Sequence, residues 1–275
     1  MLALSSESAV LAAIAVAKRV EVDAYMLGSA GLIRALEDAA ARGAGVTVRL
    51  CADPYRSDGL ARANARLAER LRADGIDARL VPEEHAKTVR ADGATFYDDC
   101  NWRASDDDTI LRDDVPDDPG VATTKGAALE LERRLLAGAE RGDRIDVETE
   151  SFGNGPISGA LARAARAGAC VRLLVDAREL RRNARERAAI SAMRRAGVVV
   201  RATDATEKFA VTDAGLWLGS ANATYGAFDQ SDWGTLAATA ARSRCSAAFE
   251  RRWSEAEEAP GVRVGAREDG LARNV

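Results

Sequence analysis

The fold is decided by two stretches of sequence that repeat one pattern, His85-Ala-Lys87-Thr-Val-Arg-Ala-Asp92-Gly93 and Thr206-Glu-Lys208-Phe-Ala-Val-Thr-Asp213-Ala-Gly215. Aligning them keeps one register over a lysine, an aspartate and a later asparagine, which indicates an internal duplication. The matched pairs, each separated by 121 positions, are Lys87 with Lys208, Asp92 with Asp213 and Asn101 with Asn222.

The surrounding segments alternate between helical and strand periodicity, and the same order restarts in the second half. The sequence therefore predicts an α/β protein with two similar halves packed about a pseudo-twofold axis, each a mixed sheet flanked by helices. The expected organisation is a first half over 1–118, a connecting helix over 119–142, a second half over 143–258 and a tail over 259–275. The predicted helices cover 8–17, 32–41, 60–73 and 127–139, and the predicted strands of the first half cover 20–27, 46–51 and 78–81.

Composition narrows the class of protein. The chain has 275 residues, 47% apolar and 30% charged, as in an ordinary globular protein, and its net charge of −4 gives no bulk attraction to nucleic acid or anionic lipid. Four cysteines without a Cys-x-x-Cys pair are typical of reduced thiols, and they favour a cytoplasmic location. The apolar run over 9–17 is too short to span a bilayer, and no other transmembrane segment is expected.

The chain contains one histidine, His85. In an extended strand, His85 and Lys87 share a face, as do Thr206 and Lys208. A pseudo-twofold axis would therefore gather one imidazole, two ammonium groups and the carboxamides of two asparagines in a single cleft. Such a cluster suits a phosphodiester: the lysines neutralise its oxygens, and the imidazole can attack phosphorus to form a phospho-histidine.

The motif from His85 to Gly93, together with Gly219-Ser220-Ala-Asn222 after the second lysine, resembles the phospholipase D superfamily of His-Lys-Asp phosphodiesterases. The resemblance implies a two-lobed fold, no metal or other cofactor, a nucleophilic histidine from one motif and a general-acid histidine from the other. It also implies a downstream carboxylate that orients a histidine. That carboxylate falls within Asp106–Asp108 in the first half, where we favour Asp107, and on Asp232 in the second.

The chain departs from this pattern in two places. Thr206 stands at the second histidine position, and Asp98-Asp99-Cys100 replaces Gly-Ser-x before Asn101. A hydroxyl is too weak an acid to replace imidazole, and the loss of a general acid usually costs about 10²–10⁴-fold in rate. Glu207 points to the opposite strand face from Lys208. Slow turnover or a stalled phospho-enzyme is therefore expected.

Other conspicuous residues have simpler interpretations. Asp92 and Asp213 are typical turn residues that accept backbone hydrogen bonds. The four tryptophans are expected mainly in the core or at its rim, and Trp102, directly after Asn101, is the candidate among them for the wall of a substrate pocket. The acidic stretch over 98–118 is interpreted as a solvated loop that would repel DNA, and the basic stretch Arg178–Arg195 as an exposed helix face leaning toward substrate or membrane headgroups.

The sequence thus favours a monomeric phospholipase D-like phosphodiesterase or phosphatidyl transferase acting on a small phosphodiester or a phospholipid headgroup. His85 is the nucleophile, assisted by Lys87, Lys208 and Asp107. The alternative is an inactive relative that binds phosphate esters or headgroups without turnover. A nuclease is the third possibility, and the acidic stretch argues against it. The expected phosphate-binding residues are Asn101, Asn222, Ser220 and Thr206.

Overall fold

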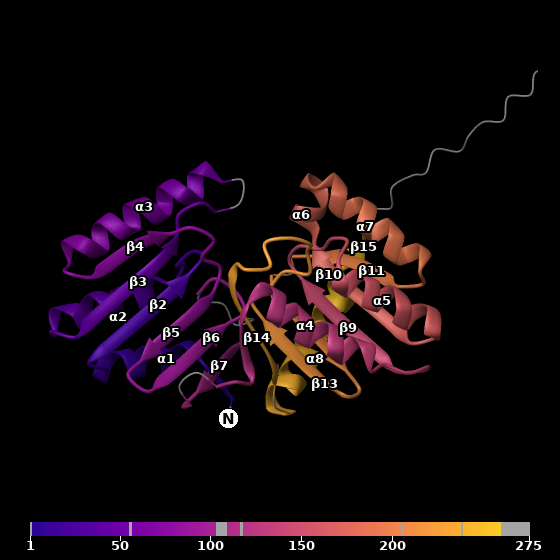
Figure 1. The fold of residues 1–275 in the computed structure, drawn as a ribbon, viewed down its shortest axis with the longest axis horizontal. Coiled ribbons are helices and arrows are strands. Elements are labelled where there is room, and N and C mark those ends of the chain that lie inside the picture. The colour runs from indigo at the N-terminus through magenta and orange to yellow at the C-terminus, as the bar shows by residue number, and fades with distance from the viewer. Residues whose placement is uncertain are drawn as a thin grey trace, which may run out of the picture.

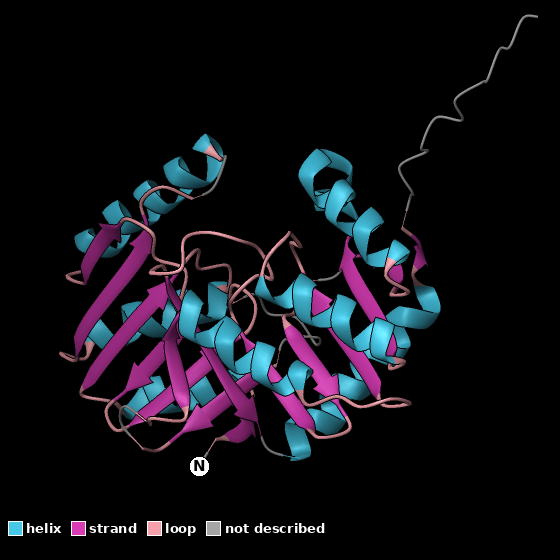
Figure 2. Cartoon of the chain, turned by 45° about the vertical axis from the view of Figure 1, so that its right-hand side comes forward, coloured by secondary structure: helices cyan, strands magenta, loops and turns pink. Residues whose placement is uncertain are grey.

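The computed structural model describes residues 2–54, 57–102, 109–115, 118–204, 206–237 and 239–259. It contains two α/β halves that lie side by side, each with helices packed over its own β-sheet (Figure 1, Figure 2). The two halves repeat one order of elements, as the duplicated sequence predicts.

The first half consists of strands β1 (Ala3–Ser5), β2 (Arg19–Ala24), β3 (Gly45–Cys51), β4 (Asp77–Val81), β5 (Lys87–Ala91), β6 (Ala94–Asp98) and β7 (Ile110–Asp113), with helices α1 (Glu7–Val16), α2 (Ala30–Ala41) and α3 (Asp58–Ala73). Among the described residues, its seven strands are ordered β1-β7-β6-β5-β2-β3-β4. Strands β2, β3 and β4 are parallel and the other neighbours antiparallel. Each helix begins after a serine, Ser6, Ser29 or Ser57, whose hydroxyl accepts a backbone hydrogen bond three residues on.

The second half consists of β8 (Val121–Thr124), β9 (Arg144–Thr149), β10 (Cys170–Asp176), β11 (Val199–Thr203), β12 (Phe209–Thr212), β13 (Gly215–Gly219), β14 (Ser231–Ala237) and β15 (Glu257–Glu258), with α4 (Lys125–Ala137), α5 (Pro156–Ala167), α6 (Ala177–Arg182), α7 (Ala184–Arg195) and α8 (Thr239–Glu255). Its described strands form a sheet in the order β15-β11-β10-β9-β12-β13-β14-β8. Pro156 occupies the first position of α5, where its missing N–H costs nothing, and Gly168 ends that helix in the left-handed region at φ +101°.

The strand registers confirm two equivalent halves. Val22 pairs with Val89 between β2 and β5, and Val147 pairs with Ala210 between β9 and β12, at the same place in each sheet. The separation between Val89 and Ala210 is the 121 positions read from the motifs. The segment over 119–142, where we expected a connecting helix, contains a short strand as well as the helix α4. Strand β8 precedes α4 there and pairs with β14 at the edge of the second sheet.

A shared apolar cluster joins the two halves. Tyr97 of β6 and Trp233 of β14 pack with their ring centroids 5.3 Å apart, and the Trp233 indole donates a 2.8 Å hydrogen bond to the Asp98 carbonyl. Each large buried side chain stabilises such a contact by about 1.5–3 kcal/mol. This packing brings the loop before β5 against the start of β14, where Glu84 and Ser231 form an isolated bridge.

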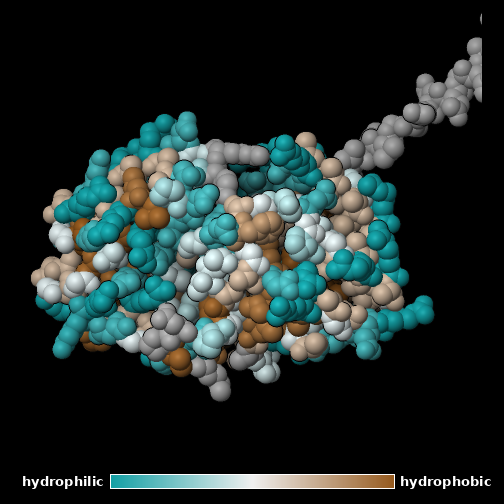
Figure 3. Space-filling model, viewed as in Figure 1, coloured by the Kyte–Doolittle hydropathy of each residue, from teal (hydrophilic) through white to brown (hydrophobic). Residues whose placement is uncertain are grey.

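Figure 3 shows hydrophilic side chains gathered over α3 at one end of the molecule and over α6 and α7 at the other. Within the described ranges, no helix combines the length and the hydropathy that crossing a membrane requires.

Candidate active site

A cleft of about 660 Å³ lies between the two halves. It is found where β2 and β9 end, and the residues that follow them, Tyr25 and Glu150, form part of its wall. The carboxyl ends of parallel strands are the common location of sites in α/β sheets. Ser57, which caps α3, contributes from the first half and Arg182 at the end of α6 from the second. In Figure 2 the loops of both halves meet in this region, between α3 and the helices α6 and α7.

His85 lines the cleft and is held by the opposite half. Its Nδ1 lies 2.8 Å from Oδ1 of Asp232. Burial works to raise the pKa of Asp232, but His85 and Lys87 hold that pKa below its ordinary value, so the carboxylate is ionised. Because an ionised carboxylate only accepts hydrogen bonds, Nδ1 carries the ring hydrogen. Nε2 therefore keeps its lone pair, as a nucleophile requires.

Asp232 is in turn fixed by two neutral donors. The Ser220 hydroxyl donates to Oδ1 at 2.6 Å and the Gln230 amide donates to Oδ2 at 2.9 Å. Ser220 is fully buried, and its hydroxyl also accepts the Trp233 backbone N–H at 2.9 Å. The structure thus places Ser220 behind Asp232, away from the cleft wall where we expected a phosphate-binding hydroxyl. Its hydrogen bonds give it a positioning role.

The two motif lysines are buried close together beneath the cleft. The Lys87 ammonium donates to the His85 carbonyl at 2.6 Å and lies 3.3 Å from Nδ1. Burial, followed by the charge of Lys208, lowers the pKa of Lys87 to about 8. Burial and then Lys87 lower the pKa of His85, so the imidazole is neutral at pH 7. A neutral imidazole beside two cations suits attack on an anionic ester.

Lys208 differs from Lys87 because it forms an ion pair with a carboxylate. Its ammonium lies 3.1 Å from Glu150 Oε2 and donates to the Thr206 carbonyl at 2.8 Å. Burial works to lower the pKa of Lys208, but Glu150 raises it above the ordinary value. Lys208 also lowers the pKa of Glu150, despite the opposing effect of burial. The pair therefore stays ionised, and the second lysine has a counterion of its own.

The position of the missing histidine contains no imidazole substitute. The Thr206 hydroxyl lies 3.7 Å from the Cys100 sulfur. Glu207 is 1% exposed, accepts a hydrogen bond from the Thr109 hydroxyl and forms an ion pair with Arg252, on the face away from Lys208. Those contacts remove Glu207 from the cleft, as the strand alternation predicts.

The two motif asparagines line the cleft, whereas the two turn aspartates bind backbone away from it. Asn101 and Asn222 both line the cleft, and Asn222 Oδ1 accepts the Ser151 backbone N–H at 3.1 Å. Asp92 accepts the backbone N–H of Arg19 at 2.9 Å, and Asp213 accepts that of Arg144 at 3.0 Å. Each aspartate thus ties its hairpin to the first residue of β2 or β9, which is a structural role.

Two further expectations concern this region. Asp107, with Asp106 and Asp108, lies outside the described residues, and the carboxylate that the structure places on His85 is Asp232 from the other half. Trp102, expected to wall the pocket, is 2% exposed and packs in the apolar core of the first half. Over the part of the chain that the structure describes, no group of three His, Cys, Asp or Glu side chains is arranged to hold a metal ion.

Sequence reasoning missed several groups of the site. Tyr25 packs edge-on against the His85 ring with centroids 4.9 Å apart, and Glu150 follows β9 as Tyr25 follows β2. Their equivalence in the repeat was the available signal. Lys125 and Gln230, which also line the cleft, stand outside the repeated motif. Only the packing of the halves identifies them.

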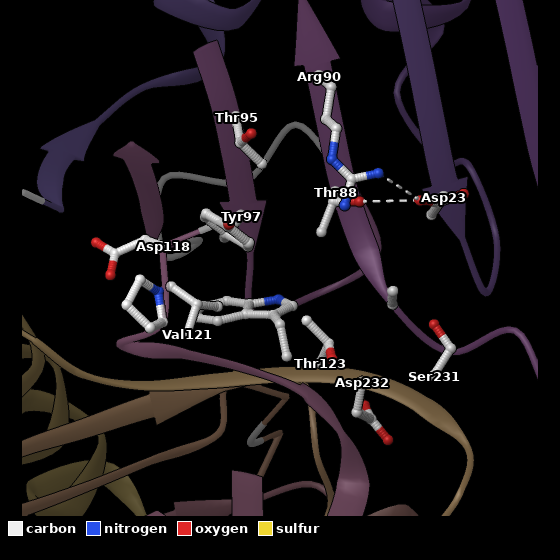
Figure 4. Close-up of a pocket in the computed structure, with 13 residues that line it drawn as sticks. Asp23, Thr88, Arg90, Thr95, Tyr97, Asp118, Val121, Thr123, Ser231 and Asp232 are labelled. Atoms are coloured by element: carbon white, nitrogen blue, oxygen red, sulfur yellow. Dashed lines mark hydrogen bonds and ion pairs between the residues drawn. The ribbon is translucent and has the colours of Figure 1, made fainter. Parts of the chain in front are cut away.

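A second cavity, of about 220 Å³, lies between β5–β6 and β8–β14 (Figure 4). Asp232 and Ser231 stand at its edge, and Arg90 lies 3.6 Å from Asp23 across its wall. The cation there is paired with a carboxylate, and His85 does not line this cavity. The larger cleft, which His85 does line, is therefore the candidate active site.

Fold and site together define a two-lobed α/β protein with a cleft that His85 lines. Residues 133–253 match the family model described as cardiolipin synthase, PLD-like domain. The fold is similar to that of polyphosphate kinase from Porphyromonas gingivalis, with a TM-score of 0.64 and 14% identity over 92% of this chain and 47% of the kinase. It is also similar to phosphatidylserine synthase from Haemophilus influenzae Rd KW20, with a TM-score of 0.63 and 12% identity over 93% of this chain and 87% of the synthase.

The PLD-like match thus covers most of the second half of the chain, and the two solved structures share the fold of both halves. The chain spans about half the length of the polyphosphate kinase that it matches. Comparison with curated protein sequences gives no match.

Proposed function

We propose that this protein is a slow phosphodiesterase or phosphatidyl transferase that works through a phospho-histidine on His85. Nε2 attacks phosphorus, and the bond between phosphorus and the leaving alcohol oxygen breaks. Water or a second alcohol then attacks phosphorus, the phosphorus–nitrogen bond breaks and His85 is regenerated. Water as acceptor gives hydrolysis, whereas an alcohol gives transfer.

The observation that carries this proposal is the hydrogen bond between His85 Nδ1 and Asp232 Oδ1. It fixes the ring tautomer and leaves Nε2 free, and it stabilises the charge that the ring acquires on phosphorylation. Lys87 supports the same step, because its ammonium lies beside the ring and suits the negative charge of an entering phosphate.

Slow turnover follows from the missing acid. The leaving alkoxide needs a proton, and the Thr206 hydroxyl does not supply one near pH 7. Water is the remaining donor, so simple alkyl leaving groups depart slowly and acidic phenols depart faster. The two lysines provide the positive charge that this reaction needs, and we propose that it runs without a metal or other cofactor.

The substrate class that we propose is a small phosphodiester or a phospholipid headgroup, in a cytoplasmic monomer. The buried position of the lysines supports a compact anion, since a long polyanion would need cations spread along an open groove.

The test is a p-nitrophenyl phosphodiester assay of wild type and His85→Ala. We expect slow release by wild type and none by the variant. Protein quenched in alkali should gain, by intact mass, one phosphoryl group that still carries the second alcohol of the diester, and mild acid should remove it. Equal rates for the two proteins would refute the proposal. Binding of the diester without turnover or phosphorylation would favour the alternative, an inactive phosphate-ester binder, for which Thr206 is the motivating residue.

A further inference from the structure

A third lysine lies in the cleft outside the repeated motif. Lys125, the first residue of α4, is 5% exposed, and its ammonium donates to the Thr224 hydroxyl at 2.8 Å. Its own backbone N–H and that of Gly126 donate to the carbonyls of Gln230 and Phe228, so the end of the helix offers no free amides there. The side chain is what lines the cleft.

This ammonium has no carboxylate counterion within ion-pair distance among the described residues. The Thr224 hydroxyl accepts its hydrogen bond, and a hydroxyl carries no charge. Burying an unpaired ammonium is unfavourable, and burial lowers the pKa of Lys125, an effect that the charge of Asp232 only partly opposes. The site thus keeps an unneutralised cation at its wall, which an anionic group of a ligand would stabilise.

The distribution of lysines in the chain also indicates that Lys125 serves the cleft. The chain has four lysines and 35 arginines. Lys18 is exposed at the far end of β2, and the other three are Lys87, Lys208 and Lys125. A chain that uses arginine almost everywhere keeps lysine at its cleft, where a compact ammonium fits a closed site better than a planar guanidinium.

A chain of hydrogen bonds connects the backbone of Lys125 to His85, but the Lys125 ammonium itself contacts neither His85 nor Asp232 within hydrogen-bond distance. Its backbone N–H is bound by Gln230, whose side chain holds Asp232, and Asp232 holds His85. The ammonium itself turns to Thr224. Lys208, by contrast, is neutralised by Glu150. Of the three buried lysines, Lys87, beside the proposed nucleophile, and Lys125 therefore have no carboxylate within ion-pair distance among the described residues.

We infer that Lys125 and Thr224 form a second anion subsite, and that the substrate is a diester whose alcohol carries a further anionic group, a phosphate or a carboxylate. This inference rests on the proposed function for the place of the scissile phosphate, next to His85. Arg182 on the rim of the same cleft adds positive charge on the approach to the subsite.

The test measures binding by calorimetry with diesters whose plain alkyl leaving groups keep them intact. Dimethyl phosphate has one anionic group, methyl 2-phosphonoethyl phosphate adds a phosphonate and methyl carboxymethyl phosphate adds a carboxylate. We expect wild type to bind at least one of the last two about tenfold more tightly than dimethyl phosphate, as a charge-assisted hydrogen bond provides. Whichever binds tighter identifies the anionic group.

Lys125→Gln should remove that preference while leaving dimethyl phosphate binding within about twofold of wild type. Lys18→Gln, which removes the same charge at an exposed site, should keep the preference. If Lys125→Gln fails to fold, Thr224→Val replaces it and should reduce the preference several-fold. An unchanged preference in these variants, an equal loss for all three ligands, or no preference in wild type overturns the inference. Because the readout is binding, the His85→Ala rate assay fails or succeeds independently of it.

Discussion

Asp232 in the second half of the chain holds His85 in the first, with 2.8 Å between Oδ1 and Nδ1. The proposed nucleophile and the carboxylate that orients its ring therefore come from opposite sides of the pseudo-twofold axis. Each half alone would have an incomplete site. The second half contributes its carboxylate although its own histidine position is Thr206, so the covalent step that we propose needs only one imidazole.

Replacing Asp232 by asparagine should reduce the rate of His85 phosphorylation by about 10²–10⁴-fold, because the amide can donate to Nδ1 and so favour the wrong ring tautomer. Phosphodiesterase rates and the amount of trapped phospho-enzyme measure this. Ser220→Ala is the milder comparison, since it removes one of the two donors that fix Asp232. A variant with Asp232→Asn that is phosphorylated at the wild-type rate would show that the hydrogen bond has no catalytic role.

The pH dependence of kcat/KM should show an alkaline limb near pH 8. The pKa of Lys87 is lowered to about 8, so its ammonium is charged below that pH and loses its proton as the pH rises through it. The pKa of His85 is lowered from 6.5, so the acid limb should lie below that value. Lys87→Arg, whose guanidinium stays charged, should move the alkaline limb upward. If the alkaline limb is unchanged in Lys87→Arg, it reports the titration of a group other than Lys87.

Glu150→Gln should strengthen the binding of inorganic phosphate about three- to tenfold. The substitution removes the counterion of Lys208, so an anionic ligand becomes the partner of that ammonium. Titration calorimetry compares it with Glu179→Gln, which removes the same charge from the cleft rim and should have a smaller effect. Weaker phosphate binding in Glu150→Gln would mean that Glu150 organises the site for its ligand.

Thr206→His should restore the missing proton donor when room is made for it. Cys100 lies 3.7 Å from the threonine hydroxyl, whereas the repeat has Ala221 at the equivalent position. We therefore expect Thr206→His with Cys100→Ala to raise the hydrolysis rate of alkyl diesters by about 10²-fold or more. Cys100→Ala alone controls for the altered packing and should leave the rate nearly unchanged. An absence of gain in the double variant, if it folds, would show that the second half no longer positions an acid.

Glu132→Gln should stabilise the fold near neutral pH. Glu132 on α4 is 1% exposed, its Oε2 has no hydrogen-bond partner, and burial raises its pKa to about 8. A folded-state pKa above the unfolded value means that the stabilisation is complete below about pH 4.5 and is lost as the pH rises through 8. We expect a gain on the order of 2 kcal/mol at pH 7 and a flatter profile of denaturation midpoints between pH 5 and about 8. A profile as steep as that of wild type would contradict the assignment.

The helices, the longer strands and their duplication could be predicted from the sequence. Apolar periodicity is local, so it predicted α1, α2 and α3 to within a few residues, and the repeated lysine, aspartate and asparagine established the register that the two sheets share. It also identified His85, Lys87, Lys208, Asn101 and Asn222 as parts of one site, because the pseudo-twofold axis of a duplicated chain brings equivalent strand ends together. Short edge strands such as β1 and β8 have too few residues to show a period.

The contacts between side chains of the site, by contrast, depend on how the two halves pack. Asp232 forms a hydrogen bond with His85, which lies 147 positions earlier in the chain, and Glu150 forms an ion pair with Lys208. Trp102 packs in the core, and Lys125 lines the cleft from α4. None of these relationships has a periodicity or a spacing in the chain. They follow from how the two sheets pack through Tyr97 and Trp233, since burial and long-range packing set the distance between charges that the sequence keeps far apart.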